Sequence, residues 1–168
     1  MANNHTAGAA ARTFAPSELC QRMLAKTSKG TCGPCILYLE DGTIFYGRAC
    51  GAEGTATGEV CFNTSLEGYF EVMTDPSYAG QIVTMTYPQI GNYGIDETDA
   101  QSVFPGDTAR PASAPAMRGM IVRDMCATPS NWRSAVSVPE YLRAHGIVAI
   151  EGVDTRALVR HLRDNGSK

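Results

Sequence analysis

The stretch from Gly58 to Gly94 constrains the fold of this chain more than any other part of the sequence. Strand-like apolar runs alternate there with short polar segments. The polar segments are Asn63-Thr64-Ser65, Thr74-Asp75-Pro76-Ser77-Tyr78 and Gly91-Asn92-Tyr93-Gly94. Binding and catalytic residues are often found on loops that a rigid scaffold holds in place. The three polar segments are therefore the first candidates for a functional site.

The apolar runs predict a fold that begins with strands. Cys35–Glu40 and Thr43–Gly47 flank Asp41-Gly42. This pattern predicts a hairpin with a two-residue type I′ turn, because Asp and Gly tolerate a positive φ. Runs of β-branched and apolar residues between turn residues predict further strands. These strands are expected over Gly58–Asn63, Tyr69–Met73 and Gln81–Tyr87.

The C-terminal third predicts a helix, a buried strand and a second helix. Ser137-Val138-Pro139-Glu140 has the pattern of a capping box, and Gly146 suits the end of the helix that follows. Ile147–Ile150 is entirely apolar, as in a strand buried on both faces. Asp154 is placed to cap a helix over Thr155–Asp164. The whole pattern favours an α/β domain built of layered sheets and helices.

Size and charge indicate one globular domain with an extension. The chain has 168 residues and a net charge of −3, which does not fit a nucleic-acid-binding surface. Residues 1–34 are expected to form a flexible N-terminal extension and residues 35–168 the folded domain. Residues 96–117 contain three prolines and no periodicity, so a surface loop is expected there.

Localisation is expected to be cytoplasmic. No apolar run approaches the roughly 18 residues of a membrane span, and the N-terminus lacks the apolar core of a secretory signal. A mitochondrial transit peptide is the weaker alternative, since Arg12 is the single Arg or Lys in the first nineteen residues.

Cys32-Gly33-Pro34-Cys35 is the most conspicuous local motif. A redox-active pair of this spacing needs a helix N-terminus after it, which lowers the pKa of one thiol. Here a hairpin follows instead, and neither the remaining cysteines nor the histidines supply the second ligand pair of a zinc site. We therefore expect no metal site and interpret the motif as incidental or as a pair with weak metal affinity, with a thiol oxidoreductase as the alternative.

No catalytic constellation can be assembled from the other polar residues. His145 and His161 fall near the predicted helix ends and lack a nucleophile partner. The glycine-rich segments match neither phosphate-binding nor dinucleotide-binding patterns. Composition alone assigns Ser77 to turn formation, because Asp and Ser satisfy backbone amides in such turns.

Many short segments, taken in order, change this interpretation. They resemble the small, glutamine-handling subunit of carbamoyl-phosphate synthase over about residues 36–166. The matching segments are Leu39–Thr43, Gly58–Val60, Phe62–Ser65, Thr74–Tyr78, Gln81–Thr84, Thr86–Pro88, Ile90–Asn92, Arg123-Asp124, Ser130–Arg133, Tyr141-Leu142, Ile147–Ile150 and Asp154–Arg156. Agreement in order across such a length is far more specific than any one motif.

The resemblance implies a three-layer β/β/α domain of the swivelling type, with mixed sheets and with helices in the C-terminal third. The family's C-terminal half is a glutamine amidotransferase with a Cys–His–Glu triad, and none of the six cysteines here matches its nucleophile. The resemblance implies that Ser77 contributes to glutamine binding across the domain interface. It also places Ser65 and Leu66 near the exit of ammonia, although Met is usual at the Leu66 position.

The same resemblance implies partners and cofactors. The expected partners are the large synthetase subunit, the amidotransferase domain and glutamine, with no nucleic acid and no membrane. ATP and Mg²⁺ would be bound by the large subunit, and no cofactor is expected in this chain. The isolated chain is expected to lack glutaminase activity. A stand-alone interaction module of the same fold remains an alternative.

Overall fold

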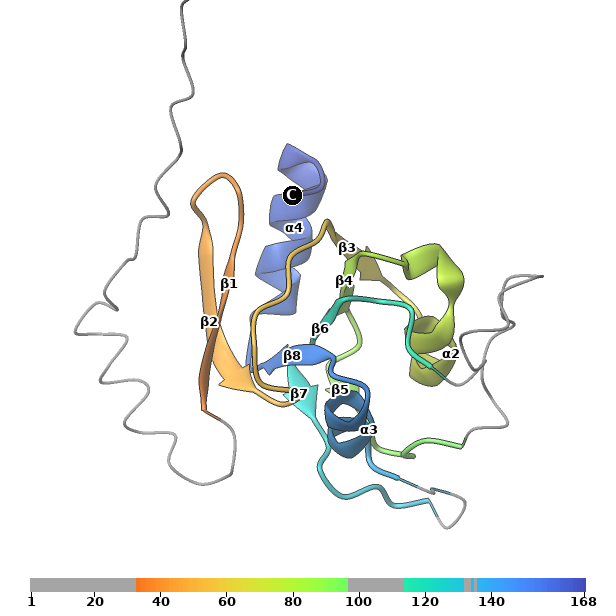
Figure 1. Cartoon of the computed structure of the whole chain (residues 1–168). Coiled ribbons are helices and arrows are strands. Elements are labelled where there is room, and N and C mark those ends of the chain that lie inside the picture. The colour runs from red at the N-terminus through yellow and green to blue at the C-terminus, as the bar shows by residue number, and fades with distance from the viewer. Residues whose placement is uncertain (1–32, 97–113, 132–133, 135) are drawn as a thin grey trace, which may run out of the picture. The chain divides into compact units, whose positions relative to one another are not determined.

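The computed structural model describes residues 33–96, 114–131, 134 and 136–168 (Figure 1). The expectations for the 1–34 extension with Cys32, and for most of the 96–117 loop, lie outside these residues. The described elements are β1 (Pro34–Tyr38), β2 (Ile44–Ala49), β3 (Val60–Asn63), α2 (Tyr69–Thr74), the 3₁₀ helix η1 (Pro76–Tyr78), β4 (Ile82–Met85), β5 (Gln89–Ile90), β6 (Gly119–Ile121), β7 (Asp124–Met125), α3 (Val138–Ala144), β8 (Val148–Glu151) and α4 (Thr155–Asn165).

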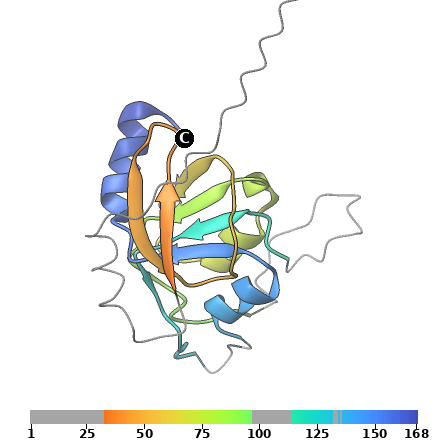
Figure 2. The same ribbon diagram turned by 60° about the vertical axis from the view of Figure 1, so that its left-hand side comes forward.

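A mixed six-stranded sheet in the order β1-β2-β8-β6-β4-β3 organises the described chain. Strands β3, β4, β6 and β8 run parallel, whereas the β1–β2 hairpin joins β8 in the antiparallel sense. The short strands β5 and β7 pair in a second, parallel sheet. Figure 2 shows the hairpin nearest the viewer, with the parallel strands of the same sheet behind it.

Alternate residues of the central strands face two separate cores, one on each side of the large sheet. Val83, Met120 and Ala149 pack with buried residues of α2, α3 and β5. Ile82, Ile121 and Ile150, their neighbours in the chain, pack with Leu158 and Leu162 of α4. The sheet is buried on both faces, which explains why its central strands are almost continuously apolar.

This arrangement confirms the predicted α/β class and layering. The small sheet, the large sheet and α4 form β, β and α layers, and α2 and α3 lie on the small sheet's side of the large sheet. Figure 1 shows α4 beside the hairpin and α2 on the opposite side of the picture. The predicted strand over Ile147–Ile150 is confirmed as β8, shifted by one residue.

The strand expected over Tyr69–Met73 is wrong, because this segment forms helix α2. Tyr69, Phe70, Val72 and Met73 are all buried, at the i, i+1, i+3, i+4 spacing of a helix face. Gly68 before them has a φ of 78°, which breaks the extended path of the chain. Four apolar residues around Glu71 are too few for their spacing to separate a buried strand from a buried helical turn.

The Asp41-Gly42 hairpin is confirmed, but its turn type is not. Leu39 N–H donates to Thr43 O at 2.9 Å and Gly42 N–H donates to Leu39 O at 2.9 Å. Gly42 has a φ of 89°, and no non-glycine residue in the described chain has a positive φ. The connection is therefore the longer type with a type I turn followed by glycine. Asp41 instead accepts a hydrogen bond from Thr43 N–H at 3.0 Å.

Both predicted helix starts in the C-terminal third are confirmed. The Ser137 hydroxyl accepts from Glu140 N–H, while the Glu140 carboxylate accepts from Ser137 N–H and Oγ–H. These hydrogen bonds lower the pKa of Glu140 below its ordinary value. Asp154 caps α4 by accepting from Ala157 N–H at 3.0 Å. Within the described residues, no helix has the length and apolarity that crossing a bilayer requires.

Candidate functional site

The loop after β3 presents two of the residues that the sequence singled out. Asn63 ends the strand, and its side-chain Oδ1 accepts a hydrogen bond from Ser65 N–H at 2.7 Å. This short-range contact holds the chain in a tight turn. Ser65 and Leu66 are exposed, and Leu66 is 74% exposed. The turn therefore displays a hydroxyl and a large apolar side chain at the end of the edge strand β3.

The turn after α2 presents Ser77. The Asp75 carboxylate accepts from Ser77 N–H at 2.8 Å and from the Ser77 hydroxyl at 2.5 Å. Pro76 begins η1, where its fixed φ is favourable. Ser77 itself is exposed. Its hydroxyl hydrogen is directed to Asp75, and the hydroxyl oxygen keeps the capacity to accept a hydrogen bond from a ligand N–H group.

A single side chain links these two turns. Asn63 Nδ2 donates to the Tyr78 hydroxyl at 2.9 Å, while Asn63 Oδ1 holds Ser65. The amide of Asn63 thus connects the loop that carries Ser65 to the turn that carries Ser77. The turn of Ser77 precedes β4, whose first residue Ile82 pairs with Val60 at the start of β3, so the Tyr78 side chain reaches along β3 to Asn63 at its end.

The third polar segment holds the far end of the same loop. The Tyr93 hydroxyl accepts from Gly68 N–H at 2.8 Å and from Tyr69 N–H at 3.2 Å. The rings of Tyr93 and Tyr69 stack with centroids 4.1 Å apart. The Tyr69 hydroxyl donates to Gly94 O at 2.8 Å. Residues 64–67 are therefore anchored on both sides, at Asn63 and at Gly68.

Tyr93 provides the cap that α2 lacks in its own sequence. Gly68 is the N-cap residue and has no side chain to accept from the first helical amides. Burial raises the pKa values of Tyr69 and Tyr93, so both phenols remain neutral. Sequence reasoning missed this role of Tyr93. The one available signal is an aromatic residue between Gly91 and Gly94 after a helix with no capping side chain.

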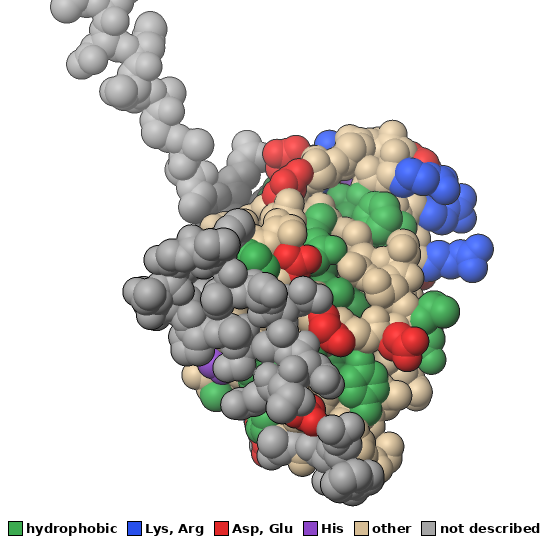
Figure 3. Space-filling view, turned by 90° about the vertical axis from the view of Figure 1, so that its right-hand side faces the viewer, with side chains coloured by type: hydrophobic (Ala, Val, Ile, Leu, Met, Phe, Trp, Pro, Cys, Tyr) green, Lys and Arg blue, Asp and Glu red, His purple; other side chains and the backbone are tan. Residues whose placement is uncertain are grey.

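Acidic and apolar side chains share the face of the molecule on which α2 lies. Figure 3 shows this face, with Asp and Glu among apolar groups and the Lys and Arg side chains gathered at one edge. Negative charge of Glu71 and Glu67 also contributes to the raised pKa of Tyr93, after the larger effect of burial. The visible part of this face lacks the clustered positive charge with which proteins bind the phosphates of nucleic acids.

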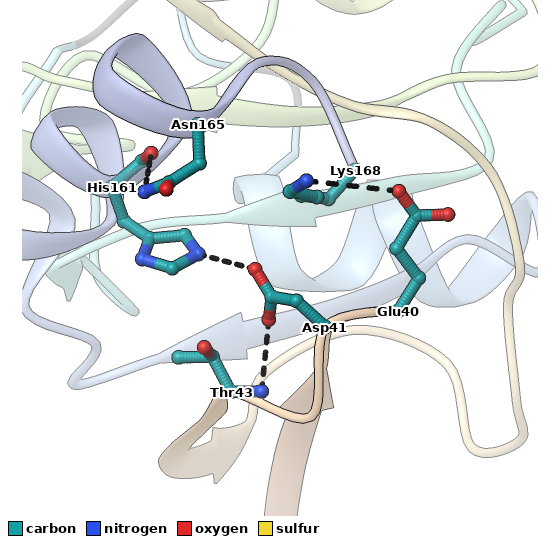
Figure 4. A network of polar contacts seen from close by, with 6 residues as sticks. All are labelled: Glu40, Asp41, Thr43, His161, Asn165 and Lys168. Atoms are coloured by element: carbon teal, nitrogen blue, oxygen red, sulfur yellow. Dashed lines mark hydrogen bonds and ion pairs between the residues drawn. The ribbon is translucent and has the colours of Figure 1, made fainter.

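His161 belongs to a different network, at the tip of the hairpin (Figure 4). Its Nε2 lies 2.7 Å from Asp41 Oδ2. Hydrogen bonds from Thr43, and then from His161, lower the pKa of Asp41 to about 2. Lys168 Nζ lies 3.9 Å from Glu40 Oε1 nearby. These contacts join the hairpin to α4 and the end of the chain, and they give His161 a structural rather than a nucleophile-activating partner.

Of the two cysteines in the Cys-x-x-Cys motif, the structure describes Cys35, whereas Cys32 lies outside the described residues. Cys35 belongs to β1, so a strand and not a helix follows the motif. Burial raises the pKa of the Cys35 thiol, the opposite of what a redox-active thiolate requires. Among the residues that the structure describes, no three His, Cys, Asp or Glu side chains are grouped as metal ligands.

Comparison with known proteins supports the resemblance. The family model described as carbamoyl-phosphate synthase small chain, CPSase domain, matches residues 37–168. The carbamoyl phosphate synthase small chain of Syntrophotalea carbinolica is 54% identical over 133 residues, which are 79% of this chain and 33% of that protein. The small chain of Xanthomonas axonopodis pv. citri is 54% identical over 135 residues, 80% of this chain and 32% of that protein.

A cyanobacterial relative agrees with these two. The small chain of Thermosynechococcus vestitus is 52% identical over 134 residues, 80% of this chain and 32% of that protein. The chain thus spans about a third of the length of the relatives that it matches. With 132 consecutive residues matched by one family model, the chain belongs to the family of carbamoyl-phosphate synthase small chains and corresponds to their CPSase domain.

Proposed function

We propose that this chain is the non-catalytic N-terminal domain of the small subunit of a glutamine-dependent carbamoyl-phosphate synthase. In the complete enzyme the small subunit would release ammonia from glutamine. The large subunit, with bound ATP and Mg²⁺, would combine this ammonia with bicarbonate to form carbamoyl phosphate for arginine and pyrimidine synthesis. Family membership over residues 37–168 supports this proposal. The cytoplasm is the compartment that fits such a synthetic enzyme.

The observation that carries the proposal is the Asn63 link between two exposed turns. Asn63 bonds to Ser65 on one side and to Tyr78 on the other. A domain that contributes to a neighbouring active site must hold its contacting groups in fixed positions before that neighbour docks. The link supplies such preorganisation for Ser65 and Ser77.

Ser77 would act as a hydrogen-bond acceptor toward glutamine. Its hydroxyl hydrogen is already directed to Asp75, so its oxygen would accept from an N–H group of the substrate. The contact would position glutamine and take no part in bond cleavage. We infer that the nucleophile, the base and the oxyanion donors come from the amidotransferase domain, so that this chain alone hydrolyses no glutamine.

Ser65 and Leu66 would lie where ammonia passes toward the large subunit. Ammonia reacts as the neutral molecule, and a passage that excludes water keeps it from becoming protonated. Leu66 is 74% exposed on a loop anchored at both ends. A large apolar side chain held in this way is suited to pack against a partner surface and exclude water.

The test of the glutamine role is Ser77→Ala in the reassembled enzyme. We expect the KM for glutamine to rise roughly fivefold, the factor that a hydrogen bond of about 1 kcal/mol supplies. Synthesis from added ammonium should keep its wild-type rate. Ser130→Ala is the matched control, because Ser130 is an exposed loop serine whose hydroxyl donates to Asn92 O. Equal losses with glutamine and ammonium would contradict the proposal.

The test of the ammonia path is Leu66→Ala in the same enzyme. We expect carbamoyl phosphate formed per glutamate released to fall below one, because water enters the passage. The free energy of unfolding should change by no more than about 0.5 kcal/mol, since the side chain is exposed. Tyr46→Ala, which shortens an exposed apolar side chain of β2, should keep the ratio. An unchanged ratio of carbamoyl phosphate to glutamate in Leu66→Ala would show that Leu66 is not part of the ammonia path.

Direct measurements distinguish two alternative functions from the proposed one. An interaction module without the enzyme would leave carbamoyl phosphate synthesis unchanged when this chain is omitted from the reconstituted subunits. A thiol oxidoreductase would reduce insulin disulfides, and the raised pKa of Cys35 argues against that activity. Glutamate release by the purified chain alone would contradict its assignment as non-catalytic.

A further inference from the structure

Strand β1 leaves one edge of its backbone without a strand partner in the described chain. β1 is the outermost strand of the six-stranded sheet. Ala49 N–H donates to Gly33 O, and Leu39 N–H donates to Thr43 O. Because bonded and non-bonded pairs alternate in an antiparallel ladder, the backbone groups of Ile36 and Tyr38 point away from β2.

An apolar groove runs beside this free edge. A cavity of about 730 Å³ lies between all of β1 and residues 54–58. Its other walls come from β3, β4, β6 and β8, through Val60, Ile82 and residues 119–121 and 148–150. Strand β3, whose Val60 lines the groove, is the opposite edge of the same sheet. The groove therefore separates the two edges that remain unpaired within the sheet.

The end of the chain leads into this groove. Val60 N–H, on the outer edge of β3, donates to Lys168 O at 2.7 Å. Lys168 also lines the groove, and its Nζ lies 3.9 Å from Glu40 Oε1 at the far end of β1. Figures 2 and 4 show this end of the chain beside the tip of the hairpin. The contact with Val60 has the form of the first rung of a β-ladder.

We propose that the groove is the binding site of one extended strand, formed by the residues that directly follow the CPSase domain in the longer small chains. This strand would bond to the outward amides and carbonyls of Ile36 and Tyr38 and continue the ladder that Lys168 begins on β3. Its inward side chains would be apolar, to match Leu37, Val60 and Ile82. Apart from Pro34 at its start, β1 has no charged residue or other device that protects an edge strand.

The proposal follows from the groove and the family match, and it is independent of the role given to Ser77. The probe is a fluorescent peptide of about ten residues, a typical upper strand length, that copies the segment after the matched region in the Syntrophotalea carbinolica small chain. Fluorescence anisotropy measures its binding to the chain. We expect saturable binding, and we expect a scrambled peptide of the same composition to bind at least tenfold more weakly.

A matched pair of variants tests the mode of binding. Ile36→Pro removes the outward N–H and places the proline ring in the groove, whereas Ile36→Ala keeps the N–H. An edge strand tolerates proline at a position that does not bond to its neighbour. We expect Ile36→Pro to weaken binding roughly tenfold relative to Ile36→Ala, through one lost hydrogen bond and a steric clash. Equal affinities of the two variants would overturn the proposal.

Amide hydrogen exchange of the unmodified chain gives a second readout that does not depend on any variant. The peptide should slow exchange at Ile36 and Tyr38, and it should leave Leu37, which already bonds to β2, unchanged. Two results would overturn the proposal. One is binding of the peptide without protection at Ile36 and Tyr38. The other is protection that appears without peptide as protein concentration rises, which would assign the groove to a second copy of the chain.

Discussion

The two ends of the molecule use different physical means to hold a loop in place. At the candidate site, neutral groups of Asn63, Tyr78 and Tyr93 fix residues 64–67, and stacked rings shield part of the contact. At the hairpin tip, the Asp41 carboxylate contacts His161 Nε2 near the surface. Neutral, partly buried hydrogen bonds are insensitive to pH and salt, whereas contacts of an exposed carboxylate depend on its ionisation and are screened by salt. This comparison predicts that the end with the candidate site is the more rigid of the two.

Among the variants that test this comparison, Tyr69→Ala is expected to lower the free energy of unfolding most. Tyr69 is 2% exposed, stacks on Tyr93 and bonds to Gly94 O. Its removal should lower the free energy of unfolding by about 3–5 kcal/mol, as for other buried aromatic residues. Urea denaturation followed by circular dichroism measures this loss. A loss below about 1 kcal/mol would show that α2 is not part of the rigid end.

A smaller and more specific effect is expected from Tyr93→Phe. This change keeps the ring stack and removes the hydroxyl that accepts from Gly68 and Tyr69. The unsatisfied amides should cost about 1–2 kcal/mol of the free energy of unfolding, and amide exchange at Gly68 should become faster. Tyr87→Phe is the control, because Tyr87 is also a half-buried tyrosine packed on the same core. Similar values for both variants would exclude the capping role.

The smallest effect is expected at the hairpin tip, and it depends on pH. The pKa of Asp41 is lowered from 3.8 to about 2 in the folded chain. The unfolded chain therefore binds more protons in this range, and the contribution of Asp41 to stability is lost as pH falls from about 4 to about 2. Asp41→Asn should reduce this loss while keeping an acceptor for Thr43.

Urea midpoints at pH 7, 4, 3 and 2 measure the effect. The difference between wild type and Asp41→Asn isolates Asp41 from Glu59 and Glu140, whose pKa values are also lowered. Tyr93→Phe should show the wild-type pH dependence, since the groups that it changes do not titrate in this range. Identical profiles for wild type and Asp41→Asn would remove the proposed contrast between the two ends.

Short sequence patterns predicted the local structure correctly where the interacting residues are neighbours in the sequence. Ser137 with Glu140, and Asp154 with Ala157, lie three residues apart, and both predicted helix starts are confirmed. The apolar run Ile147–Ile150 correctly predicted a buried strand. The resemblance that implied Ser65 and Ser77 as site residues also depended on local segments, and these residues lie on the two turns that Asn63 links.

Prediction failed where distant residues decide the local structure. The strand expected over Tyr69–Met73 is a helix whose first amides bond to Tyr93, more than twenty residues away in the chain. The contact between Asp41 and His161 spans 120 positions. No periodicity or spacing encodes such pairs, because they form only after the sheet brings their elements together.

The sequence by itself determined the α/β class, the caps of the last two helices, the buried central strands and the family. These features depend on hydrophobic periodicity and on hydrogen bonds between near neighbours, which any short window of residues contains. Only the tertiary structure decided the helical state of Tyr69–Thr74, the role of Tyr93 and the link from Asn63 to Tyr78. Their energies come from side chains that meet across the fold, and burial then makes each unsatisfied group costly.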